Sequence, residues 1–269
     1  MPLRFAEYLA IEGHENWSNL KNMARSPLHY FYGKQHQRED NTTLARGRGV
    51  HTATLEPEKF DSEYVIFPGK TRRGKEWDAF KEEHADTTIL KAEERDKVWA
   101  AAEAVRRHPE ARALMRSGVS EQSYKWIDAE SQLPCKCRVD WVGDVLFDLK
   151  STGDVEARKF GNIAARLMYH GQLAMYADGS GHRGKVFIVA VEAEPPHDVC
   201  VSEVDEDALL AGRELYTGML KRVVECRASG VWLGRYPERT VLSLPRYIFE
   251  DDEQEDGTSV VVETEEDAE

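Results

Sequence analysis

The sequence predicts an α/β protein in which helices flank a central mixed β-sheet. Three observations lead to this fold class. Apolar residues recur at helical spacing through most of the first 117 residues, the pattern then changes to two-residue alternation up to residue 150, and helical spacing later returns on both sides of two further strands. A chain of 269 residues can bury a core of this kind within one large domain.

The expected helices begin and end at residues with capping or helix-breaking chemistry. Ser18 can cap a short helix that ends near Ser26 and Pro27, and Pro27 suits the first turn of the next helix. Asp205 can cap the last helix, which Gly230 ends. The remaining helical segments are residues 44–56, which follow Asn41-Thr42-Thr43, residues 88–117 with an interruption at Pro109, and residues 156–176.

The expected strands are short runs with alternating or continuous apolar residues. They are residues 64–67, 119–127, 135–142, 145–150, 185–193 and 199–204. The third and fourth of these runs are joined at Gly143 and Asp144, which is typical of a hairpin.

Charge is concentrated at the C-terminus. Residues 250–269 carry 11 Asp and Glu and no Lys or Arg, so without them the net charge changes from −13 to −2. A nearly neutral body does not exclude a polyanionic partner, and so acidic a tail is expected to be solvated and disordered. We therefore expect one domain over residues 1–249 and an acidic tail over residues 250–269.

Several classes of protein are disfavoured by composition. No apolar run approaches the length of about 18 residues needed to span a bilayer, and the N-terminus lacks the apolar region of a signal peptide. Four cysteines in a chain of this length do not make a disulfide framework. The expectation is a cytoplasmic protein with no membrane partner.

Two acidic residues and a lysine stand close together on the expected hairpin. In the second strand Asp148 and Lys150 share one face, because side chains alternate along a strand. A three-residue loop at 143–145, or a bulge, would place Asp140 opposite Asp148, whereas a two-residue turn would place it opposite Phe147. We expect the former. The other face of the first strand is expected to carry Cys135, Cys137, Val139 and Trp141.

Two carboxylates about 5 Å apart repel each other unless a cation lies between them. Oxygen ligands of this kind suit Mg²⁺, for which Mn²⁺ can substitute. Lys150 could then assist an attacking water and neutralise charge on a phosphoryl oxygen. The alternative is a hairpin that merely carries solvated charges.

Motifs in three places resemble those of one nuclease superfamily. Val139-Asp140 followed by Asp148-Leu149-Lys150 resembles the PD-(D/E)XK motif, with Val139 in place of the proline. The segment 172–176, Gln-Leu-Ala-Met-Tyr, is similar to the Q-x-x-x-Y motif of the RecB-type branch, and His51 to its helical metal-binding histidine. From about residue 19 to residue 228 the chain resembles the RecE-type exonuclease domain, exodeoxyribonuclease VIII.

The resemblance implies a PD-(D/E)XK core and a Mg²⁺-dependent exonuclease that acts on double-stranded DNA ends. It further implies processive 5′→3′ digestion that leaves 3′ overhangs for a single-strand annealing protein during recombination. Relatives of this type form rings, so a homo-oligomer is expected, with a tetramer favoured over a trimer.

The resemblance also implies a role for each matching residue. The metal ligands would be His51, Asp140, Asp148 and the Leu149 carbonyl; Lys150 would serve the attacking water; and Gln172 and Tyr176 would position the terminal nucleotide. Basic residues expected to grip DNA phosphates beside the site are Arg46, Arg48, Lys70, Arg72 and Arg73.

Two other functions stay open at this point. A structure-specific or restriction-type endonuclease could use the same core, and a non-catalytic DNA-binding module could keep the fold alone. The intact Asp–Asp–Lys set argues against the second. An iron–sulfur cluster is not expected, because the four cysteines do not have the spacing of its ligands.

Overall fold

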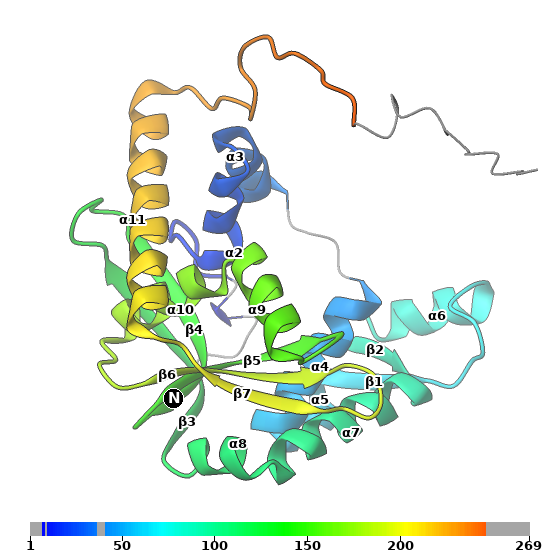
Figure 1. Cartoon of the computed structure of the whole chain (residues 1–269). Coiled ribbons are helices and arrows are strands. Elements are labelled where there is room, and N and C mark those ends of the chain that lie inside the picture. Colours follow the sequence, from blue (N-terminus) through cyan, green and yellow to red (C-terminus); the bar gives the residue numbers. More distant parts are fainter. Residues whose placement is uncertain (1–6, 9, 37–40, 246–269) are drawn as a thin grey trace, which may run out of the picture. The chain divides into compact units, whose positions relative to one another are not determined.

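The computed structural model describes residues 7–8, 10–36 and 41–245. The chain divides into two compact units, Met1–Arg235 and Tyr236–Glu269, and the first holds every helix and strand named below (Figure 1). The predicted boundary at residue 249 and the acidic tail lie outside the described residues and stay predictions.

A five-stranded mixed sheet forms the centre of the first unit, with strand order β3-β4-β5-β6-β7. Neighbouring strands are antiparallel except β5 and β6, which are parallel because the chain crosses over through two helices between them. The mixed sheet and its five strands confirm the prediction. Their bounds are β3 Gly118–Ile127, β4 Pro134–Gly143, β5 Leu146–Thr152, β6 Val186–Glu192 and β7 Val199–Glu203.

A second sheet of two parallel strands stands apart from the first. β1 (Tyr64–Phe67) matches its prediction, but β2 (Thr88–Lys91) occupies residues that helical spacing assigned to the start of a helix. That assignment is wrong because Leu90 is fully buried within the pairing with β1, and pairing across distant segments outweighs local preference. Between these strands lies α6 (Lys75–Glu83), which was not predicted.

Several helix boundaries lie at residues that the sequence marks. Asp205 caps the last helix and Gly230 ends it with φ 71°, as predicted. Ser26 and Asn41, which were expected beside helix boundaries but not as caps, each accept a hydrogen bond from the first turn of the following helix. Asn16, not Ser18, caps the first described helix. These helices are α2 Trp17–Leu20, α3 Pro27–Gln35, α4 Thr42–Leu55, α5 Phe60–Glu63, α7 Ala92–Arg107, α8 Pro109–Leu114 and α11 Glu206–Ser229, with 3-10 turns at Lys21–Ala24 and Pro57–Lys59.

The single helix expected over residues 156–176 is two helices, α9 (Ala157–Arg166) and α10 (Tyr169–Ser180). Met168 lies between them in the left-handed conformation, with φ 57° and ψ 42°. Apolar residues keep their helical spacing across this position, so the pattern contains no sign of the break. No helix in the described part of the chain is long and apolar enough to cross a bilayer.

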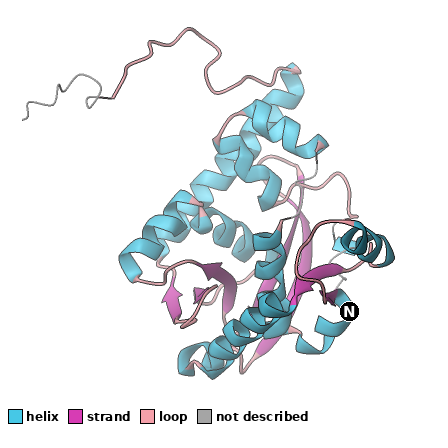
Figure 2. Ribbon diagram, turned by 90° about the vertical axis from the view of Figure 1, so that its right-hand side faces the viewer, coloured by secondary structure: helices cyan, strands magenta, loops and turns pink. Residues whose placement is uncertain are grey.

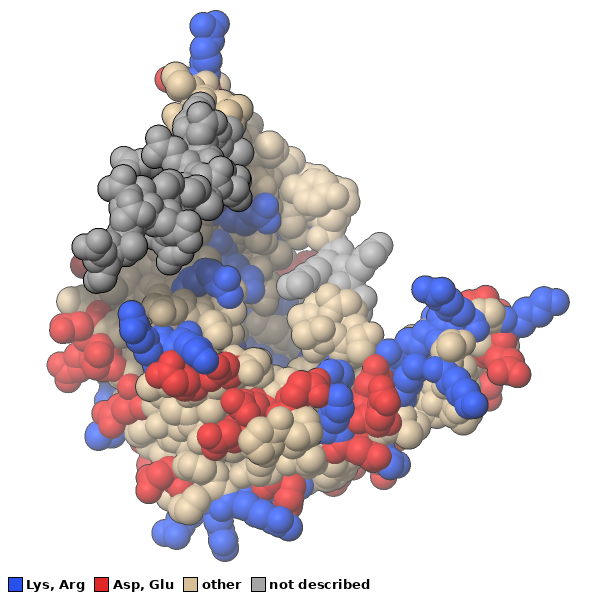
Figure 3. Space-filling view, turned by 45° about the vertical axis from the view of Figure 1, so that its right-hand side comes forward, with Lys and Arg blue, Asp and Glu red and all other residues tan. Residues whose placement is uncertain are grey.

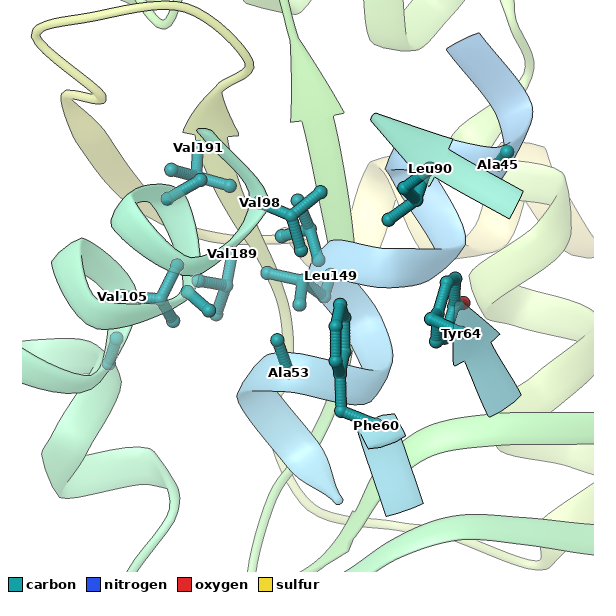
Figure 4. Close-up of a cluster of buried hydrophobic side chains, with 14 of the residues drawn as sticks. Ala45, Ala53, Phe60, Tyr64, Leu90, Val98, Val105, Leu149, Val189 and Val191 are labelled. Atoms are coloured by element: carbon teal, nitrogen blue, oxygen red, sulfur yellow. The ribbon is translucent and has the colours of Figure 1, made fainter. Parts of the chain in front are cut away.

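The sheet is covered on both faces by helices (Figures 1 and 2). On one face, side chains of α4 and α7 pack against Leu149, Val189 and Val191 (Figure 4). On the other face, Phe160 of α9 and Leu173 of α10 pack with Val139 and its neighbours. A strand covered on both faces has nearly all its side chains buried, which makes a charged residue there conspicuous.

The contact between α10 and α11 is close enough to exclude a side chain. A Cβ added at Gly212 would lie 2.2 Å from the backbone oxygen of His170. We expect Gly212→Ala to lower the free energy of unfolding by about 1–3 kcal/mol, because neither backbone can move without separating the helices.

Gly218 on the same helix is the matched control, since its added Cβ would meet no described atom within 4 Å. Gly218→Ala should raise the free energy of unfolding by about 0.5–1 kcal/mol, through the better helix propensity of alanine. Urea titrations of both variants measure this difference in sign, and equal effects would contradict the packing argument.

Candidate active site

The hairpin between β4 and β5 has the register that brings its two acids together. Trp141 pairs with Phe147 and Val142 with Leu146, which leaves residues 143–145 as the three-residue loop that was predicted. Continuing this register places Asp140 opposite Asp148. Asp140 also joins the strands directly, because its Oδ2 accepts a hydrogen bond of 2.7 Å from the Leu149 N–H.

β4 changes the faces of its side chains at Asp140. Cys137 and Val139 pack on the α10 side of the sheet, whereas Trp141 packs on the α4 side with Phe147. The predicted common face of Trp141 with Val139 is therefore wrong. Opposite Asp140 on β3, Glu121 has φ 54°, a conformation that is uncommon for this residue type, so the irregularity spans both strands. It allows Asp140 to share the face of Asp148.

His51 reaches this hairpin from α4. Its Nε2 lies 3.1 Å from Asp140 Oδ2, and its Nδ1 lies 2.9 Å from the backbone oxygen of Gly47. Burial lowers the pKa of His51, but the charge and hydrogen bond of Asp140 outweigh it and raise the pKa to about 9. At neutral pH the imidazole is thus protonated, both nitrogens donate, and the pair is a salt bridge that lowers the pKa of Asp140.

Asp148, Lys150 and Gln172 form a closed set on the same face. The Lys150 ammonium is paired with Asp148 Oδ2 and donates to Gln172 Oε1 at 3.1 Å, while Gln172 Nε2 donates to Asp148 Oδ1 at 2.8 Å. Burial raises the pKa of Asp148 to about 6, although Lys150 opposes this. The pKa of Lys150 is raised because the two acids outweigh the effect of burial. Lys150 is therefore a protonated donor at neutral pH.

Tyr176 lies one turn beyond Gln172 on α10 and packs against two hydrophobic clusters. Burial holds its pKa well above the usual value, so its hydroxyl stays protonated. The structure thus brings His51, Asp140, Asp148, Lys150 and Gln172 into one connected group and places Tyr176 beside it, while their catalytic roles stay predictions.

Sequence reasoning missed two contributors to this group. The Tyr169 ring lies beneath the Lys150 ammonium, with Nζ 4.6 Å from the ring centroid. Tyr169, Gln172 and Tyr176 recur at helical spacing, and that signal could have identified Tyr169. Glu121 accepts a hydrogen bond of 2.5 Å from Arg138 Nε, and burial with the charge of Asp140 raises its pKa to about 7. Its position depends on strand pairing, which leaves no sequence motif.

The predicted DNA-binding residues differ in their surroundings. Arg46 donates to Glu194 at 2.7 Å and to the Ala193 carbonyl at 2.9 Å, and Arg72 forms a bidentate pair with Glu94 at 2.7 and 2.5 Å. Both arginines thus already have protein partners. Arg48 lies on α4, and Lys70 and Arg73 are exposed between β1 and α6. Contact of all five with DNA stays a prediction.

The group fits a divalent cation. Asp148 Oδ2 is buried and, among the described residues, has the Lys150 ammonium as its partner, so a carboxylate oxygen with further lone-pair capacity is left for a ligand. Carboxylate oxygens are suitable ligands for Mg²⁺ or Mn²⁺, and the His51 imidazole could join them only after its Nε2 loses the proton that it donates to Asp140. Within the described residues, no three His, Cys, Asp or Glu side chains already surround one point as metal ligands would. Instead, His51 pairs with Asp140 and Lys150 pairs with Asp148. The Leu149 carbonyl lies between Asp148 and Lys150 in the chain, and its role as a ligand stays a prediction.

A mixed sheet whose hairpin carries Asp140, Asp148 and Lys150, with helices on both faces, defines the PD-(D/E)XK nuclease class, whose members generally use divalent metals. The comparison with family models agrees: the model of a PDDEXK-like domain of unknown function, DUF3799, matches residues 16–238. The chain belongs to this family.

Solved structures support the fold. A protein from Eubacterium rectale described as a candidate exonuclease is similar with a TM-score of 0.65 and 15% identity, over 91% of this chain and 96% of that one. A phage-related exonuclease from Haemophilus somnus 129PT matches 83% of this chain and 98% of that one at 10% identity, but its TM-score of 0.37 is too low to support an argument. None of the curated proteins compared with this chain is significantly similar to it.

Proposed function

We propose that this protein is a metal-dependent exonuclease that degrades double-stranded DNA from its ends, of RecE type. The observation that carries the proposal is the closed set of Asp148, Lys150 and Gln172 beside the His51–Asp140 pair. A structural role does not require two acids, each with its own cation, on one face of a buried hairpin, since buried ion pairs contribute little net stability.

Each side chain has a role that its contacts support. Asp140, Asp148 and His51 would hold Mg²⁺, or Mn²⁺ in its place, and the bound cation would supply positive charge to the scissile phosphate and lower the pKa of water. Lys150 would donate a hydrogen bond to the same phosphate. Gln172 keeps the Lys150 ammonium directed at the site from one side, and its hydrogen bond to Asp148 fixes that carboxylate.

The finer features of the proposal rest only on the resemblance of the sequence motifs to RecE-type exonucleases. They are 5′→3′ direction, processivity, 3′ overhangs for recombination, a homo-oligomeric ring and a single-strand annealing protein as partner. The second candidate is a structure-specific endonuclease, since the same side chains on the hairpin could also cleave an internal phosphodiester bond.

One assay separates these functions. The purified chain is incubated in Mg²⁺ with a linear duplex labelled at the 5′ or the 3′ end and with a covalently closed circle. We expect release of the 5′ label as mononucleotide, an intact circle, and no product in excess EDTA. Cleavage of the circle would favour the endonuclease, and cleavage in EDTA would contradict the metal-dependent assignment.

Tyr169 should hold the Lys150 ammonium through its ring and not through its hydroxyl. A cation–π contact of about 0.5–2 kcal/mol corresponds to about a 2- to 30-fold effect, so Tyr169→Leu should lower kcat by this factor, whereas Tyr169→Phe should preserve it. Steady-state digestion of a linear duplex measures both. Tyr32→Leu, at an exposed position on α3, is the control, and equal losses for Phe and Leu would show that the hydroxyl matters instead.

A further inference from the structure

The segment after the catalytic strand is basic in a chain that is acidic overall. Residues 157–177 contain Arg158, Lys159 and Arg166 and no Asp or Glu, although the chain has a net charge of −13. These three cations all belong to α9. A concentration of positive charge without interspersed acids is the pattern that proteins use to attract phosphates.

α9 exposes most of its surface. Phe160 is its one buried residue, so the helix is attached to the sheet along a narrow stripe. Arg158, Asn162 and Arg166 recur every four residues and therefore share a face, and all three are exposed. Lys159 differs from them because it pairs with Asp154 at 2.6 Å.

The helix lies close to the candidate active site. Its buried Phe160 contacts the Tyr169 ring, with centroids 6.4 Å apart, and Tyr169 in turn lies against Lys150. In Figure 1, α9 lies beside α10, the helix that carries Tyr169 and Gln172. Figure 3 shows a hollowed face with Lys and Arg side chains inside it and mixed charges along its lower rim.

We infer that the exposed face of α9, formed by Arg158, Asn162 and Arg166, binds backbone phosphates of the DNA substrate next to the scissile bond. The inference rests on the proposed function and deepens it. The two arginines are eight residues apart, which is about 12 Å along a helix, so they would meet different phosphates of a duplex that carries one charge per about 1.7 Å. Asn162 between them can donate to a third phosphate oxygen or to a sugar.

This surface differs from the one expected from the sequence alone. Arg46 and Arg72 are held by Glu194 and Glu94, so contact with DNA would first have to break those pairs. Arg158 and Arg166 form no ion pair with any described residue, so a phosphate would meet a cation that has no protein partner to lose.

The test is the salt dependence of DNA binding by the full chain. Fluorescence anisotropy of a labelled duplex is measured without divalent metal, between about 50 and 200 mM salt, for wild type and for Arg158→Gln/Arg166→Gln. Each lost phosphate contact lowers the slope of log K against log salt by about 0.9, so the double variant should be less steep by about 1.8.

Two further variants serve as controls. Arg112→Gln/Arg116→Gln removes the same charge from exposed positions on and just after α8, which packs on the opposite face of the sheet, and should leave the slope unchanged. Arg158→Lys/Arg166→Lys keeps the charge and should restore the slope of the wild type. Equal slopes for the α9 glutamine variant and the α8 variant would overturn the inference alone. A wild type that does not bind duplex DNA at all would contradict the proposed function as well.

Discussion

Asp148→Asn should abolish DNA cleavage and leave a folded protein. The substitution keeps the size of the side chain but removes the buried carboxylate whose Oδ2 is paired with the Lys150 ammonium. Loss of one preorganised charged group at a reacting centre typically costs about 10²–10³ in kcat, and loss of a metal ligand should cost at least as much. Single-turnover digestion of an end-labelled duplex in Mg²⁺ measures the effect.

The control for this variant is Asp144→Asn, in the loop of the same hairpin. Asp144 is exposed and lies four residues from both Asp140 and Asp148, so its charge is solvated and cleavage should not change. Both variants should remain folded and retain duplex binding without metal, but Asp148→Asn should have a lower unfolding temperature because it leaves the buried Lys150 ammonium without its carboxylate partner. If Asp148→Asn cleaved as fast as Asp144→Asn, the assignment of the hairpin as the active site would be wrong.

Glu15→Ala should cause the largest loss of stability. Glu15 is fully buried and accepts hydrogen bonds from the Tyr30 hydroxyl at 2.7 Å and from Arg227 at 2.6 Å, with Lys34 at 3.3 Å. Breaking such a buried pair costs about 3–5 kcal/mol, and the lower end applies because Lys34 and Arg227 can be hydrated. Thermal unfolding should show a Tm lower by roughly 2–4 °C per kcal/mol.

Glu12→Ala removes an exposed carboxylate from the same segment and should change the Tm little. Glu15 also joins this segment to β4, because its backbone N–H donates to the Pro134 carbonyl and its own carbonyl accepts from Lys136, both at 2.7 Å. Glu15→Ala should therefore also loosen the packing of two helices against the sheet. They are α3, which carries Tyr30 and Lys34, and α11, which carries Arg227. Similar Tm values for the two variants would contradict this account.

Features that depend on local chemistry were predictable from the sequence. Helix caps such as Ser26, Asn41 and Asp205 act within one turn, and the alternation that identifies β4 and β5 depends only on neighbouring residues. Local alternation left both a two-residue turn and a three-residue loop possible, and the three-residue loop was expected because it places Asp140 opposite Asp148. The hairpin that carries Asp140, Asp148 and Lys150 was predicted with its register on that ground.

Features that depend on distant contacts were not predictable. β2 exists because it pairs with β1, and the change of face at Asp140 accompanies the unusual backbone of Glu121 on a separate strand. The break at Met168 leaves the apolar spacing intact. At the site, His51 and Gln172 could be proposed from motif resemblance. The ion pairs of Arg46 with Glu194 and of Arg72 with Glu94 could be seen only in the folded structure.

Each acid of the candidate site is paired with a cation of the protein, so the chain can fold before any metal binds. In many small metalloproteins the ligands repel one another until metal binds, so the metal-free chain unfolds. Here His51 already neutralises Asp140, and Lys150 neutralises Asp148, so the negative charge of the site is balanced without metal. An incoming cation must compete with these two residues, which weakens its affinity and makes it readily exchangeable. The concentration of divalent cation would thus act as a reversible switch on turnover, while the chain keeps its structure in either state.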